Sequence, residues 1–119
     1  MSMSIKAIFA KVSKHLIKQN ARSVNEDGDC AYRDHRGQSC AIGCLIPEDR
    51  YYPRLEGMDL NCDLEIRHVL TPVIGVNPKK RREKLDLLQA LLIVHDECDV
   101  SQWETELATV KAEYLLICP

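Results

Sequence analysis

The chain has 119 residues, of which 45% are hydrophobic and 29% charged, with a formal net charge of −2. This length and composition exclude a disordered or low-complexity chain and predict a single domain, residues 1–119, with a core that needs no disulfide or metal. No signal-peptide pattern and no long apolar run is visible, so we expect a cytoplasmic protein whose six cysteines stay reduced.

Residues 4–19 have the apolar spacing of an amphipathic helix, with Ser4 placed to cap its start and Asn20 placed to end it. Lysines occupy the opposite face: Lys11, Lys14 and Lys18. A basic face can meet phosphates or an acidic partner, but a solvated surface is the simpler interpretation.

Residues 30–57, CAYRDHRGQSCAIGCLIPEDRYYPRLEG, form the region around which the rest of the chain is organised. Residues 30–33 and 38–42 are short strand candidates, and residues 34–37 between them suit a four-residue hairpin turn. Such a ribbon is marginal alone. The predicted fold class is therefore α+β, a small mainly helical domain with one β-hairpin packed on the helices. No internal repeat is evident.

Three helices are expected in the second half of the chain. A short one covers residues 61–70, and the longest starts at Asn77 and runs to about Glu97, with basic residues from Lys79 to Lys84 in its first turns. The last follows a predicted capping box of Ser101 and Glu104. Cations at a helix start oppose the macrodipole, which is a weak indication that they are used.

Two catalytic or metal-binding arrangements are conceivable. Cys30, His35, Cys40 and Cys44 are four ligand types that zinc accepts, but they lack a C-x-x-C knuckle, and we predict no metal site. Cys30 or Cys40 could act as a nucleophile if the fold brought His95 and Asp96 beside it, although the sequence has no nucleophile signature. Burial as small hydrophobic residues is the simpler interpretation of the cysteines.

Tyrosine and arginine, the residues enriched in binding hot spots, gather in and after the expected hairpin. We predict a partner-binding surface there, made of Tyr32, Arg33, His35, Arg36, Arg50, Tyr51, Arg54 and Glu56.

The region also resembles a pattern in small uncharacterised proteins of tailed phages and prophages: C-x-Y-R, a turn with glycine, C-A-[IV]-G, then L-I-P-[DE], a tyrosine and E-G. The matching positions are Cys30, Tyr32, Arg33, Gly37, Cys40, Ala41, Gly43, Leu45, Ile46, Pro47, Glu48, Tyr51, Glu56 and Gly57, with His95, Asp96 and Trp103 further on. The resemblance implies a phage accessory protein, a class whose members often bind a host or defence factor. It implies no catalytic residue.

The expected function is therefore non-enzymatic binding and modulation of a host or defence protein through the hairpin region, without a cofactor or a membrane. One alternative is a small enzyme or nucleotide-binding protein that uses the Cys/His/Asp groups and the hairpin arginines. Another is a nucleic-acid binder that uses the basic helix faces, for which we expect only weak binding.

Overall fold

A computed structural model describes residues 2–115, and the structural statements below concern those residues. The first helix, α1, spans Ile5–Gln19, and the Ser4 hydroxyl caps it by accepting a hydrogen bond from the Ala7 N–H at 3.1 Å. Asn20 ends the helix with a φ of 51°. The predicted apolar stripe is confirmed by four buried side chains: Ile8, Phe9, Val12 and Leu16.

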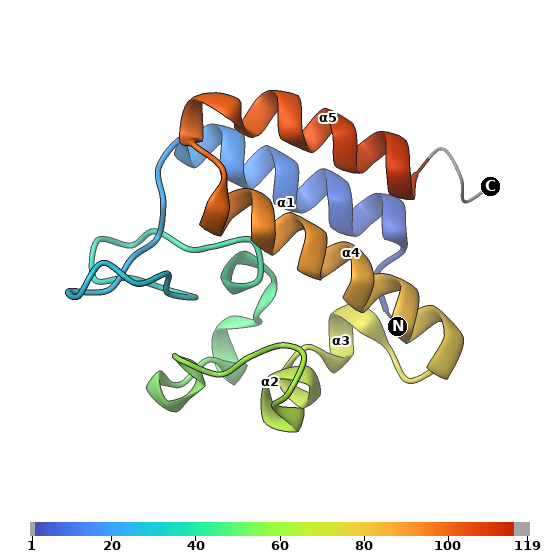
Figure 1. The fold of residues 1–119 in the computed structure, drawn as a ribbon. Coiled ribbons are helices and arrows are strands. Elements are labelled where there is room, and N and C mark those ends of the chain that lie inside the picture. The colour runs from blue at the N-terminus through green and yellow to red at the C-terminus, as the bar shows by residue number, and fades with distance from the viewer. Residues whose placement is uncertain (1, 116–119) are drawn as a thin grey trace.

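Two further long helices, α4 (Pro78–Glu97) and α5 (Trp103–Tyr114), pack with α1 as a layer of three neighbouring helices (Figure 1). The central core helix is α4, as predicted, and its Leu87, Leu88 and Leu91 are fully inaccessible to solvent. The predicted capping box before α5 does not form. A short 3-10 turn, η4 (Val100–Gln102), precedes α5 instead, and the Ser101 hydroxyl bonds to Asp99.

The middle of the chain, residues 20–76, lies on one side of this helical layer (Figure 1). It contains three 3-10 turns and two short helices: η1 (Gly43–Leu45), η2 (Glu48–Arg50), η3 (Pro53–Leu55), α2 (Leu64–Val69) and α3 (Thr71–Ile74). Fully buried Ile42, Leu55 and Leu70 join this part of the chain to the core under α1 and α4. No helix among residues 2–115 is both long and apolar enough to cross a membrane.

The predicted α+β fold class is wrong, because residues 2–115 contain no strand and no hairpin. One isolated antiparallel bridge, Arg33 with Ser39, is the remnant of the expected pairing, and a second bridge, Val24 with Cys30, was not expected. The mainly helical part of the prediction holds.

The hairpin fails because its backbone donors are bound elsewhere. The Glu56 carboxylate accepts hydrogen bonds from the Tyr32 N–H at 2.8 Å and from the Arg33 N–H at 3.0 Å. On the other side, the Cys40 N–H bonds to the Tyr32 carbonyl, and the chain then turns directly into η1. A β-ladder cannot extend when the backbone donors of one strand are already bound and the other strand continues into a helical turn.

Residues 23–40 instead form two consecutive loops with the same hydrogen-bond pattern. In the first loop, Asn25 Oδ1 accepts from the N–H groups two and four residues later, at 2.9 and 3.0 Å. In the second, Asp34 Oδ1 does the same at 2.9 and 2.9 Å. Each loop has glycine three positions after its Asn or Asp, with φ of 87° at Gly28 and 80° at Gly37.

The second loop is held by a buried carboxylate. The Asp34 side chain is fully buried and also accepts a hydrogen bond from the Val24 N–H, which ties the second loop to the first. Burial raises the pKa of Asp34, but the backbone N–H groups of Gln38, Arg36 and Val24 outweigh it and hold the pKa below its ordinary value. The two loops are therefore ordered by side-chain acceptors rather than by strand pairing.

Arg22 fixes the loops to the carboxyl-terminal end of α4. Its Nε donates to the His95 carbonyl at 3.1 Å, and a second guanidinium nitrogen donates to the Cys98 carbonyl. The last carbonyls of a helix lack partners within it, and a cation there also complements the helix dipole. The loops thus depart from a fixed position on the helical layer.

Gly43 allows the second loop to pack closely on η1. A Cβ atom at this position would lie 1.8 Å from the Tyr32 carbonyl oxygen. The glycine in the C-A-[IV]-G pattern is therefore required by a backbone-to-backbone contact.

Candidate functional site

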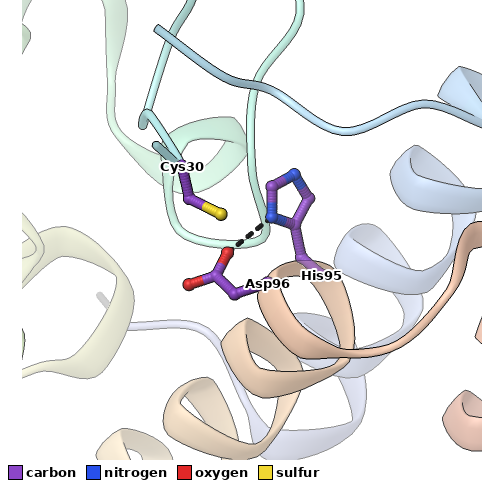
Figure 2. Close-up of side chains that lie close together, drawn as sticks. All are labelled: Cys30, His95 and Asp96. Carbon is purple, nitrogen blue, oxygen red and sulfur yellow. Dashed lines mark hydrogen bonds and ion pairs between the residues drawn. The ribbon is translucent and has the colours of Figure 1, made fainter. Parts of the chain in front are cut away.

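Two places in the structure gather chemically active side chains, and the first is the cluster of Cys30, His95 and Asp96 (Figure 2). Their nearest ligand atoms all lie within 4.8 Å of one another. His95 and Asp96 come from the last turns of α4, and Cys30 comes from the end of the first loop. The fold therefore creates the juxtaposition that a cysteine nucleophile would need.

The hydrogen bonds of His95 decide what this cluster can do. Its ring is fully buried, and Nε2 accepts a hydrogen bond from the Ser23 N–H at 3.0 Å. Because a backbone N–H can only donate, Nε2 carries the lone pair and Nδ1 carries the proton. Nδ1 donates that proton to the Asp96 carboxylate at 2.6 Å. Both ring nitrogens are thus occupied, and neither is free to take a proton from Cys30.

The Cys30 thiol is also held in its unreactive form. Burial, with a further contribution from the adjacent Asp96 carboxylate, raises the pKa of Cys30 to about 12. Since the thiolate is the nucleophile, this environment opposes cysteine catalysis. Burial likewise raises the pKa of Cys40 and brings that of Cys44 to about 12.

A metal ion does not fit the Cys30–His95–Asp96 cluster either. A metal bound at Nδ1 needs that nitrogen without its proton, while the Ser23 N–H requires the lone pair at Nε2. The ring would have to be an anion to satisfy both. The cluster therefore fastens the first loop to α4.

The four residues weighed from the sequence as zinc ligands are not brought together. Cys40 is buried, His35 is exposed at the tip of the second loop, and Cys30 faces Asp96. The five cysteines in the described part of the chain are free. Cys118, the sixth, lies outside the described residues.

The second place is built around Glu56. Besides the Tyr32 and Arg33 backbone donors, its carboxylate accepts a hydrogen bond from the Tyr51 hydroxyl at 2.6 Å. The Tyr32 ring is buried, and its hydroxyl donates to the Met58 carbonyl. Tyr32 and Glu56, both predicted as binding residues, therefore lie inside the segment and order it.

Arg33 lies over the ring of Tyr51, with its guanidinium carbon 4.4 Å from the ring centroid. It also donates to the Ile46 carbonyl at 2.9 Å and pairs with the exposed Glu48 at 3.3 Å. A guanidinium stacked on an aromatic face and anchored to a carbonyl is held in one orientation, and the Arg33 side chain is 23% exposed.

Arg54 makes a similar stacking contact with Tyr52, the residue after Tyr51. Its guanidinium carbon lies 5.9 Å from the Tyr52 ring centroid, and it pairs with Glu65 of α2 while 73% of its side chain stays exposed. We refer to Arg33, Tyr51, Tyr52 and Arg54 as the Arg–Tyr surface.

The other predicted binding residues lie elsewhere. His35 and Arg36 are exposed on the second loop, where Arg36 pairs with Asp34. Arg50 is exposed on η2 and lines a separate cavity with residues of α3 and α4. Tyr52, which stands beside Tyr51 in the same cluster of tyrosines and arginines, is also a member of the Arg–Tyr surface.

Within residues 2–115, no ion pair joins the acidic side chains of α5 to the lysines of α1 or to those at the start of α4.

Comparison of the chain with protein-family models, with curated proteins and with solved structures finds no match. The functional assignment therefore depends on the geometry of the chain itself.

Proposed function

We propose that this chain is a non-enzymatic binding protein that modulates a partner protein through the Arg–Tyr surface. The observation that carries the proposal is the order of this surface before any partner arrives. Glu56 and the Ile46 carbonyl hold Arg33 and Tyr51 in place. A pre-ordered arginine and tyrosine lose little conformational entropy on binding, which is the property of interface hot spots.

The Cys30–His95–Asp96 cluster supports a non-enzymatic role, because its groups are not available for catalysis. Its histidine is committed to two internal hydrogen bonds, and its thiol has a raised pKa. The groups that could perform chemistry are thus used to hold the loops, while Arg54 is largely exposed and Arg33, Tyr51 and Tyr52 are partly exposed.

The resemblance of residues 30–57 to small phage proteins supports a host or defence factor as the partner. This is a proposal from context, since a fold or pattern does not fix a function. Small phage accessory proteins often bind and modulate a host or defence factor, for which a surface without a catalytic centre is sufficient.

The test is affinity purification of the tagged chain from host cells, with the enriched proteins identified by mass spectrometry. The wild type is compared with Arg33→Ala combined with Tyr51→Ala, and with Arg54→Ser. A control variant combines Lys14→Ser and Lys18→Ser, two exposed positions on α1.

We expect the wild type and the lysine control to enrich the same partner, and the variants of the Arg–Tyr surface to lose it. Arg54→Ser is informative because Arg54 is exposed and its replacement leaves the packed segment intact. Equal enrichment by all variants would show that the partner binds elsewhere.

A further inference from the structure

A cavity of about 620 Å³ lies where the start of α4 meets α3 and the N-terminal segment. The polar side chains around it are basic or neutral, and no acidic side chain lines it among the described residues. They include Ser2, Arg50, His68, Asn77, Lys80 and Lys84. The walls come from η2, α2, α3 and α4, so cations distant in sequence converge on one space.

Lys84 is the unusual member of this set. Only 6% of the residue is exposed, and within residues 2–115 its ammonium group makes one hydrogen bond, to the Ser2 hydroxyl at 3.0 Å. An ammonium group has three protons to donate, and a buried cation is costly unless it is paired. Lys84 makes no ion pair with any described carboxylate.

Among residues 2–115, the negative charge near Lys84 compensates its burial only in part. Burial lowers the pKa of Lys84 below its ordinary value, the neighbouring Lys80 lowers it further, and Glu83 opposes them only in part. A bound anion would supply the missing countercharge and an acceptor for the ammonium protons.

We propose that this cavity binds the phosphate group of a small phosphorylated molecule of mononucleotide size, with Lys84 as the buried cationic ligand. Arg50 offers a planar fork that fits phosphate oxygens, and Lys80 adds a second ammonium group. The positive end of the 20-residue helix α4 lies at the same place.

The rest of the cavity determines the size of the ligand. Apolar Pro72, Ile74 and Val76 form part of its lining, which suits the uncharged body of a small molecule. Its volume falls within the range of about 300–1,000 Å³ that is common for small-molecule sites. Inorganic phosphate alone would fill only a part of it.

The experiment is a titration of the isotope-labelled protein with pyrophosphate and with adenosine monophosphate, followed by backbone amide NMR shifts. Wild type is compared with Lys84→Met and with Lys79→Met, a matched control because Lys79 is exposed in the first turn of α4 and does not line the cavity. Lys80→Met serves as a second cavity variant.

We expect saturable shifts in the wild type for amides around residues 75–84. Lys84→Met should weaken binding by about tenfold or more, as loss of a charged hydrogen bond does, and Lys80→Met should weaken it also. Lys79→Met should leave the affinity nearly unchanged because an exposed charge is screened.

A second readout separates a binding role from a structural one. Lys84 is a buried cation without an ion pair among residues 2–115, so its replacement by methionine should leave the thermal midpoint equal to or above that of the wild type. The absence of saturable shifts at millimolar ligand, or equal losses in Lys84→Met and Lys79→Met, would overturn the proposal. Binding of a single-stranded oligonucleotide but of neither small ligand would overturn it too. Lys84 is not part of the Arg–Tyr surface, so none of these outcomes bears on the proposed partner binding.

Discussion

Replacement of Glu56 by glutamine tests whether one carboxylate organises the binding segment. The Glu56 oxygens accept three hydrogen bonds, at 2.8 Å from the Tyr32 N–H, 3.0 Å from the Arg33 N–H and 2.6 Å from the Tyr51 hydroxyl. Glutamine has the same shape but only one accepting oxygen. In its best orientation the amide oxygen serves Arg33 and Tyr51, and the amide nitrogen then faces the Tyr32 N–H, donor against donor.

The expected cost follows from these contacts. An unsatisfied buried donor costs about 1–3 kcal/mol, and each remaining bond loses about 1 kcal/mol when its acceptor becomes neutral. Glu56→Gln should therefore lower the free energy of unfolding by about 3–5 kcal/mol and the thermal midpoint by about 12–20 °C. Urea unfolding followed by helical circular dichroism and by Trp103 fluorescence measures this loss.

Two comparisons make the result decisive. Glu48→Gln removes the charge of a side chain that is 93% exposed and pairs with Arg33, so it should cost less than about 0.5 kcal/mol. Burial, followed by the Glu56 interaction, raises the pKa of Tyr51 to about 12. In Glu56→Gln the pKa of Tyr51 should fall, because the Glu56 contribution is lost, but stay above its ordinary value because burial persists, and an ultraviolet titration of the tyrosines detects this fall. Equal stability of the Glu56 and Glu48 variants would refute the bracing role of Glu56.

Three other outcomes follow from the loops and the cluster. Gly43→Ala should destabilise the protein by about 3 kcal/mol in urea unfolding, because the new Cβ would clash with the Tyr32 carbonyl. Gly28→Ala should cost only about 1 kcal/mol, because its Cβ would meet no atom and only its positive φ is unfavourable. Similar losses of stability in the two variants would contradict this reasoning. Asp34 has a lowered pKa, so its contribution exists above about pH 4 and disappears as the pH falls further. The stability difference between wild type and Asp34→Asn should accordingly be about 2 kcal/mol at neutral pH and shrink in acid, and a constant difference would speak against it. Cys30 and Cys62 both belong to exposed residues, so the raised pKa of Cys30, about 12, should make it alkylate more slowly than Cys62 at neutral pH. Mass mapping that shows equal rates would disprove the thiol assignment.

Apolar periodicity was sufficient to predict the helices of the bundle. The stripe of α1 and the central position of α4 follow from side chains three and four residues apart, which is local information. The hairpin could not be excluded in the same way. Its donors are taken by Glu56, which stands 24 and 23 residues after Tyr32 and Arg33, and no local pattern shows such a competitor.

Two features had a signal in the sequence that was not used. The Asn25–Gly28 and Asp34–Gly37 pairs have the same three-residue spacing and mark the two equivalent loops. Lys84 stands four residues before Leu88 and seven before Leu91, on the buried stripe of α4, so helical spacing indicated its burial. The convergence of Arg50 and His68 on Lys84 depends on the path of residues 43–76 and was not accessible from local pattern.

Cys30, His95 and Asp96 lie together, as the nucleophile hypothesis required, but the sequence does not define the role of this cluster. What decides the role is the Ser23 N–H, a backbone group that no sequence motif records. Because this hydrogen bond occupies His95 Nε2, the cluster holds the first loop on α4 and has no free base for catalysis.

The most direct test of the proposed function is calorimetric titration of the purified partner, once captured, with the wild type and with the variants of the Arg–Tyr surface. The account predicts that Arg33→Ala with Tyr51→Ala weakens binding by at least about tenfold, beyond what its modest loss of stability explains. Arg54→Ser should weaken binding without loss of stability, and the Lys14→Ser and Lys18→Ser control should bind as the wild type does. Wild-type affinity in both Arg–Tyr variants would contradict the account.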